Sequence, residues 1–165
     1  MTGNGTNWKQ LRQAYKKFCV QFDPTEMVNL AINQNLDLES VKKRLGRFSG
    51  RMDSWGIGTT WSKTHVSGRA NGVFFVEHVR SNIHLHGLVH FPYGNRYGRT
   101  LVAQDVWSFL CPSGTIKMRR AYDPMGAADY MTKEMKWRDY DDRQIILLAD
   151  LMSEKSLSQR PTKQR

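Results

Sequence analysis

Two histidines separated by one residue, His84 and His86, stand in a short run of β-branched and apolar residues, 82–90. Because side chains alternate across a strand, the two imidazoles would share one face and Leu85 would take the other. Two imidazoles on one face can bind a single metal ion, but paired histidines also occur on ordinary solvated strands. The pair alone leaves both interpretations open.

An acidic residue in the preceding run strengthens the metal interpretation. Residues 72–79 also have a strand-like composition, so the two runs predict a β-hairpin. A turn of two or four residues centred on 81–82 would pair Glu77 with His86. Directly opposed residues of an antiparallel pair point to the same face, so Glu77 would join His84 and His86 as a third ligand.

The length of the turn decides which residue joins the histidines. A turn with an odd number of residues would shift the register by one and place His78 there instead of Glu77. We favour the even turn because it gathers four apolar side chains on the opposite face: Phe74, Val76, Leu85 and Val89. Two histidines and one carboxylate suit a divalent ion that polarises a substrate oxygen.

A second group of reactive side chains follows about forty residues later. On a helix predicted over residues 127–137, Tyr130 and Lys133 are three residues apart and share a face. The side of this helix that packs would carry Ala127, Met131 and Met135. A tyrosine hydroxyl has a pKa of about 10, so a tyrosine nucleophile needs help, and a nearby ammonium favours the phenolate. The same spacing also fits a half-buried tyrosine beside a surface lysine, and Tyr122 is the alternative nucleophile.

Bulk composition points to a polyanionic partner. The 165 residues include 25 Lys and Arg against 15 Asp and Glu, a net charge of +10, which favours nucleic acid. We expect one domain over residues 1–153 and a disordered basic tail over 154–165. Cys19 and Cys111 lie in apolar settings without paired spacing, which indicates buried thiols in a reducing compartment. No secretion signal, membrane span or nucleotide-hydrolysing loop is recognisable.

The remaining elements are predicted from hydrophobic periodicity. Asp37 is a candidate N-cap for a helix that ends near Gly56, whose other face carries Lys42, Lys43, Arg44, Arg47 and Arg51. That basic face is either simply solvated or contacts phosphate. The other expected elements are a helix from Trp8, with a helix or a strand at 18–22, a helix at 24–31, a strand at 57–64, a loop at 93–99, a helix at 103–110 with Phe109 buried, a strand at 115–122 and a helix at 141–153.

Together these motifs resemble the HUH endonuclease superfamily, in particular its rolling-circle replication initiator (Rep) branch. Residues 83–87, Ile-His-Leu-His-Gly, match the His-hydrophobic-His motif, and Glu77 stands where that branch often carries an acidic ligand. Residues 130–133, Tyr-Met-Thr-Lys, match the single-tyrosine motif, and the histidines precede the tyrosine as in this branch. The resemblance covers roughly residues 18–137; the family's N-terminal strand motif is poorly matched at 18–22.

The resemblance implies an α+β domain, ferredoxin-like, with a central antiparallel sheet and flanking helices. It implies a site-specific single-stranded DNA endonuclease and ligase, with Mg²⁺ or Mn²⁺ on Glu77, His84 and His86. Tyr130 would attack the scissile phosphate with help from Lys133, leaving a 5′-phosphotyrosine and a free 3′-hydroxyl. Such an enzyme initiates rolling-circle replication of a virus, phage or plasmid at an origin hairpin. It would act inside the cell, in the cytoplasm or in a eukaryotic nucleus, alongside a separate helicase and DNA polymerase.

Several further residues are candidates for DNA contact, through base stacking or through phosphate pairing: Trp61, Lys63, Arg69, Arg80, Lys117, Arg119 and Arg120. The main alternative is a basic module that binds single-stranded nucleic acid without cutting it. Others are a metal-dependent phosphodiesterase that uses water, and a transposase or mobilisation nuclease of the same superfamily. A covalent protein–DNA adduct distinguishes the tyrosine mechanism from the binding module and from the water-using phosphodiesterase.

Overall fold

The computed structural model describes residues 8–136 and 141–152. Within them, five strands form one antiparallel sheet in the order β4-β1-β3-β2-β5. The strands are β1 (Glu26–Ala31), β2 (Asn71–Glu77), β3 (His84–His90), β4 (Thr115–Arg120) and β5 (Ile145–Leu147). The α-helices are α1 (Trp8–Gln21), α2 (Leu38–Ile57), α3 (Arg96–Leu110) and α4 (Pro124–Met131). The predicted α+β fold with a central antiparallel sheet and flanking helices is confirmed.

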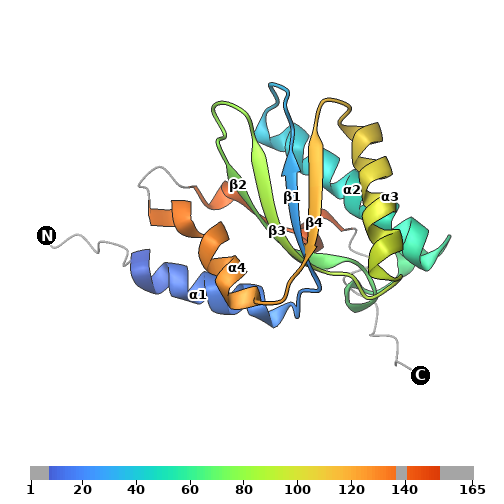
Figure 1. Ribbon diagram of the computed structural model, residues 1–165, viewed down its shortest axis with the longest axis horizontal. Helices are drawn as coiled ribbons and strands as arrows, with labels where there is room; N and C mark the ends of the chain where they lie inside the picture. Colours follow the sequence, from blue (N-terminus) through green and yellow to red (C-terminus); the bar gives the residue numbers. More distant parts are fainter. Residues whose placement is uncertain (1–7, 137–140, 153–165) are drawn as a thin grey trace, which may run out of the picture.

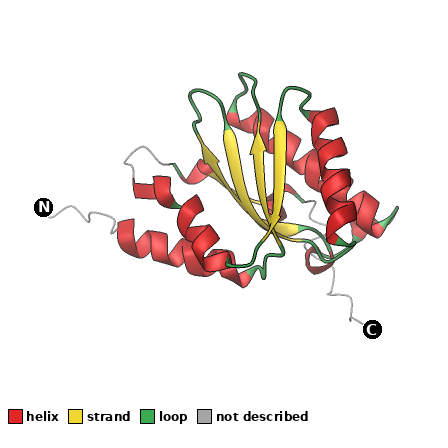
Figure 2. Cartoon of the chain, in the orientation of Figure 1, coloured by secondary structure: helices red, strands yellow, loops and turns green. Residues whose placement is uncertain are grey.

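The chain order β1-α2-β2-β3-α3-β4, with these strands arranged β4-β1-β3-β2, is the β-α-β-β-α-β arrangement of ferredoxin-like folds. Helices α2 and α3 cover one face of the sheet, and α1 and α4 cover part of the other (Figure 1; Figure 2). The short strand β5 extends the sheet beyond β2. The protein is therefore a three-layer structure with two separate helical layers.

Alternation along the strands divides the apolar residues between two cores. The face toward α2 and α3 buries alternate residues of the three central strands: Val28, Leu30, Phe74, Val76, Leu85 and Val89. The face toward α1 and α4 buries Val73, Phe75 and Leu88 together with Cys19, Ala128 and Met131. Both cysteines are buried free thiols, as expected. Because residues two apart share a face, Glu77, His84 and His86 belong to the side of α1 and α4.

The hairpin has the predicted faces but not the predicted partners. Glu77 lies opposite His84, and Phe75 lies opposite His86, so the pairing is shifted by two residues from the predicted one. The connection, residues 78–83, still contains an even number of residues, so Glu77 shares the face of both histidines. The connection is longer than predicted because the strands separate at Glu77 and His84.

Helix α2 begins as the sequence indicates. The Asp37 side chain accepts a hydrogen bond from the Ser40 backbone N–H at 2.7 Å, which caps the helix. The strand predicted at 57–64 is wrong: α2 continues to Ile57, and a short 3₁₀ helix, η1 (Trp61–Lys63), follows. Gly58 ends the helix with a φ of 91°, in the left-handed region that glycine adopts without strain.

Other boundaries also differ from the predictions. The helix predicted at 24–31 is strand β1, and α1 runs through residues 18–21, so there is no strand there. Helix α3 starts at Arg96, because Asn95 caps it by accepting a hydrogen bond from Gly98 N–H, and this shortens the loop predicted at 93–99. Phe109, predicted to be buried, is 68% exposed.

The C-terminal region differs as well. Residues predicted as a helix at 141–153 instead form η4 (Asp142–Gln144), strand β5 and η5 (Leu148–Leu151). Residue 153 and the predicted tail, 154–165, lie outside the described residues. In the part of the chain that the structure describes, no helix combines the length and apolarity needed to cross a bilayer.

Candidate functional site

Four polar residues gather on the sheet face beside α4. Across the sheet, His84 lies opposite both Glu77 of β2 and Ala31 of β1, while His86 lies opposite Asn29 of β1. Directly opposed residues share a face, so Glu77, His84, His86 and Asn29 all point to the side of α1 and α4. Helix α4 contacts β3, which brings the tyrosine-bearing helix to these residues.

Glu77 is a buried carboxylate at the centre of this group. It is 3% exposed; its Oε2 lies 3.2 Å from His86 Nε2, and its Oε1 is buried without a hydrogen-bond partner among the described residues. Burial alone would raise the pKa of the Glu77 carboxyl. The hydrogen bond from His86 and the charges of His86, Lys133 and His78 act in the opposite sense, and the net pKa lies below its usual value. Glu77 is therefore held as a carboxylate, and its Oε1 can still accept a hydrogen bond or bind a cation.

His86 is oriented from its other ring nitrogen. Its Nδ1 donates a hydrogen bond to Asn29 Oδ1 at 2.9 Å, so Nε2 faces Glu77. In metal-binding histidines a second residue fixes the ring orientation in the same way, and a metal ion bound at Nε2 would take the place of the proton between Nε2 and Glu77. Sequence reasoning missed Asn29 because residues 24–31 were assigned to a helix, which hides the alternation that places Asn29 beside His86.

His84 and His78 complete the cluster. Their rings meet edge to face with centroids 5.7 Å apart. Burial lowers the pKa of His84, and the neighbouring His78 and His86 lower it further against the opposing charge of Glu77. The neutral imidazole that results is the form that binds metals. His78 has a φ of 57°, which interrupts the strand alternation and places its Nε2 4.0 Å from Glu77 Oε2.

The donor set fits a divalent ion at Glu77 and His86. Two ligands about 2.1 Å from one ion and at right angles to each other are about 3.0 Å apart, close to the observed 3.2 Å. Within residues 8–136 and 141–152, no three His, Cys, Asp or Glu side chains are already assembled to hold a metal ion. Convergence of His84 with the other two ligands stays a prediction.

Tyr130 projects from the end of α4 toward the histidines. Its ring is 5.9 Å from the His86 ring, centroid to centroid, and the side chain is 53% exposed. The predicted packing side of its helix is buried: Ala127, Met131 and Met135. The α-helix is shorter than predicted and ends at Met131, so Lys133 begins the 3₁₀ helix η3 (Lys133–Lys136). The Lys133 ammonium still lies over the Tyr130 ring, 4.0 Å from its centroid.

Helix α1 fixes the turn that carries the tyrosine. Arg12 donates hydrogen bonds to the Asp129 carbonyl at 2.8 Å and to Thr132 Oγ1 at 3.3 Å. Lys16 pairs with Asp129 Oδ1 at 2.7 Å. These contacts hold Asp129 and Thr132, the residues on either side of Tyr130 and Met131. Local sequence patterns gave no indication of these contacts. The alternative nucleophile, Tyr122, is 81% exposed and lies beneath the Arg120 guanidinium.

The predicted DNA-contact residues divide into separate groups. Lys117 lies opposite Asn29 and Arg119 opposite Met27, so both exposed cations share the face of His86. Arg80 is exposed in the connection between β2 and β3, and Arg120 points to the other face of β4. Only Lys117 and Arg119 thus join the tyrosine site on the open sheet surface.

The remaining three DNA-contact candidates lie elsewhere. Trp61 and Lys63 are on η1, which packs against α2 on the far side of the sheet. Arg69 is 4% exposed, and its Nε pairs with Asp53 at 2.7 Å. Because Asp53 is itself fully buried and needs a counter-charge, Arg69 has a structural role here, and its contact with DNA stays a prediction.

Comparison with known proteins gives this chain no relative: no protein-family model, no curated protein and no solved structure matches it. Function is therefore inferred from the chain's own side chains.

Proposed function

We propose that this protein is a metal-dependent single-stranded DNA endonuclease that cuts through a covalent tyrosine intermediate. The observation that carries the proposal is the position of Tyr130, whose ring lies 5.9 Å from that of His86, while His86 in turn lies 3.2 Å from the Glu77 carboxylate. A tyrosine next to a histidine–carboxylate pair places a nucleophile beside groups suited to a divalent ion.

Each residue has a defined part in this reaction. Glu77, His84 and His86 would hold Mg²⁺ or Mn²⁺, which when bound polarises a non-bridging oxygen of the scissile phosphate. Asn29 keeps His86 in the orientation that presents Nε2. Lys133, whose ammonium lies over the Tyr130 ring, would balance negative charge on the phosphoryl group. Tyr130 supplies the nucleophilic oxygen from a helix that α1 holds in place.

The proposed step is a transesterification. The Tyr130 oxygen bonds to phosphorus, and the bond between phosphorus and the 3′ oxygen breaks. The phenolic proton passes to solvent, and the departing oxygen takes up a proton to become a free 3′-hydroxyl. The 5′ phosphate stays on Tyr130, and reversal of the step rejoins the strand without an external energy source. Such chemistry suits initiation of rolling-circle replication at an origin hairpin.

The open sheet face provides a place for the substrate strand. Lys117 and Arg119 are exposed on the same face as His86, on the edge strand β4. Cations on this strand would bind phosphates of the same DNA strand and help to hold the scissile phosphate for in-line attack. This arrangement favours cutting over binding alone, because a binding module has no need for a tyrosine beside a histidine that contacts a buried carboxylate.

The test is cleavage of a pool of labelled single-stranded oligonucleotides with Mn²⁺, run in parallel with excess chelator. We expect cleavage and a protein-linked product with metal alone. His84→Ala should abolish both while the protein remains folded by circular dichroism. Tyr122→Phe removes the hydroxyl of the alternative nucleophile; as a control variant it should cut normally. Cleavage that persists in chelator, or that gives no protein-linked product, would contradict the proposal.

A further inference from the structure

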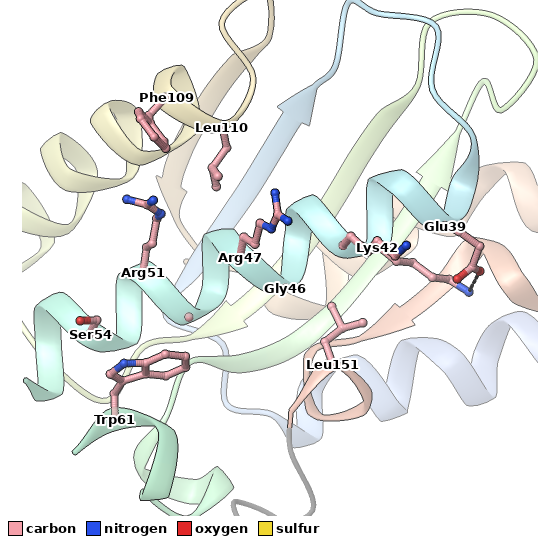
Figure 3. Close-up of a pocket in the computed structure, with 12 residues that line it drawn as sticks. Glu39, Lys42, Gly46, Arg47, Arg51, Ser54, Trp61, Phe109, Leu110 and Leu151 are labelled. Carbon is pink, nitrogen blue, oxygen red and sulfur yellow. Dashed lines mark hydrogen bonds and ion pairs between the residues drawn. The ribbon is translucent and has the colours of Figure 1, made fainter. Parts of the chain in front are cut away.

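A basic groove runs along α2 on the face of the sheet opposite Tyr130. It has a volume of about 870 Å³ and lies between α2, the end of α3, Trp61 and Leu151 (Figure 3). In Figure 3, Arg47 and Arg51 point toward Phe109 and Leu110 of α3, while Trp61 and Leu151 border the other side of α2. We call this surface the α2 groove. Nothing in the proposed cleavage reaction uses it.

The cations of the α2 groove form a regular row. Lys43, Arg47 and Arg51 recur every fourth residue, so they lie along one side of the helix about 6 Å apart. Lys42 adds a fourth cation and pairs with Glu39 at 3.2 Å. Among the described lining residues, Glu39 is the one acidic side chain. The groove therefore carries a strong positive charge, in a line rather than in a cluster.

Aromatic rings border this row of cations. Phe109 is 68% exposed, with the Arg51 guanidinium 4.5 Å from the centroid of its ring. The Trp61 ring lies against the backbone of α2 at Gly50, where an added Cβ would come within 2.9 Å of it. The exposed, flat ring of Phe109 offers a platform on which an unpaired base can stack.

We propose that the α2 groove is a second binding site for single-stranded nucleic acid. A single row of cations at this spacing matches one phosphate backbone, and the aromatic rings provide stacking that a duplex, with its bases paired, cannot use. The inference is independent of the cleavage chemistry, because α2 and α4 lie on opposite faces of the sheet. The protein would then hold two strands, or two parts of one strand, at once.

Binding stoichiometry tests the second site directly. With an oligothymidylate of about 8 nucleotides, within the length that one single-strand site covers, calorimetry in chelator should give two equivalents for the wild type. The double variant Arg47→Ala/Arg51→Ala should bind one equivalent. Its slope of log affinity against log salt for a longer strand should fall by about 1.4, since each phosphate contact contributes about 0.7.

The matched control removes the same charge elsewhere. Lys9→Ala/Lys17→Ala takes two exposed cations from α1 and should keep both equivalents. A groove variant that still binds two equivalents, or a control that loses one, would overturn the inference. Cleavage of a short substrate by the groove variant should remain at the wild-type rate, so failure of the second site and failure of the cleavage proposal are distinguishable.

Two further measurements identify the occupant. An oligonucleotide carrying 5-iodouracil should photocross-link to Trp61 or Phe109 in the Tyr130→Phe variant, and Phe109→Leu should reduce the yield. Cross-links found only on the face of Lys117 would overturn the assignment. Polyglutamate should compete poorly with DNA for the groove; equal competition would indicate a site for acidic protein segments instead of one that stacks bases.

Discussion

The hydrogen bond between Asn29 and His86 provides a quantitative test of the proposed metal site. Replacing Asn29 with leucine keeps a side chain of similar size on β1 but removes the oxygen that accepts from His86 Nδ1 at 2.9 Å. Without this partner the imidazole can rotate and take the wrong tautomer. Loss of such an orienting residue typically weakens metal affinity about 10- to 100-fold, which is about 1.4–2.7 kcal/mol of binding free energy.

Titration with Mn²⁺, followed by calorimetry or by the electron paramagnetic resonance of the free ion, measures this effect. Asn29→Asp is the matched control, because it keeps an acceptor oxygen at the same position and should bind Mn²⁺ at least as tightly as the wild type. Thermal melts confirm that both variants are folded. Equal Mn²⁺ affinity in Asn29→Leu and the wild type would refute the assignment of His86 as a ligand oriented by Asn29.

Three further predictions concern the surroundings of the site. Lys133→Ala should slow adduct formation about tenfold, equivalent to about 1.4 kcal/mol of activation free energy, without abolishing it in a single-turnover assay. Lys117→Ala/Arg119→Ala should weaken binding of the substrate strand and lower its salt slope by about 1.4; an unchanged slope would exclude phosphate contacts there. Gly87→Ala should destabilise the fold by about 1–3 kcal/mol in denaturant melts, because the added Cβ would lie 2.4 Å from the Phe74 ring; wild-type stability would show that the ring can move aside.

The hairpin was predictable because its alternation is strong and its central residues are buried. Val76 and Leu85 had to face a core, and this alone placed Glu77 with the two histidines, even though the pairing was shifted by two residues. A shift by two preserves the face, whereas a shift by one would not. The face was therefore determined by burial, while the exact partners depended on where the connection begins.

Strand β1 was missed because its residues also fit a helix. Pro24 suits a helix start, and Met27, Leu30 and Ala31 have helical spacing. In the structure, alternate residues of β1 are buried, as in a strand, and the first of them is the charged residue Glu26. Glu26 is 1% exposed because Arg99 pairs with it at 2.8 Å. That partner is far away in the sequence, so local patterns could not identify Glu26 as an inward-facing residue.

The orienting contacts of the site are likewise long-range. Asn29 of β1 contacts His86 of the neighbouring strand β3, and Arg12 of α1 contacts Asp129 of α4. Residue types and spacing were enough to predict the candidate reactive groups, Glu77 and Tyr130 among them. The groups that position them become visible only once the strands and helices are assembled.

The central claim is that Tyr130 becomes covalently linked to DNA. Wild-type protein is incubated with Mn²⁺ and a single-stranded oligonucleotide that it cleaves, then digested, and the nucleotide-bearing peptide is sequenced by mass spectrometry. We expect a 5′-linked nucleotide on Tyr130, and no adduct in Tyr130→Phe, although that variant should still bind the strand because it loses only a hydroxyl. A nucleotide on Tyr122, or cleavage without any adduct, would contradict the mechanism.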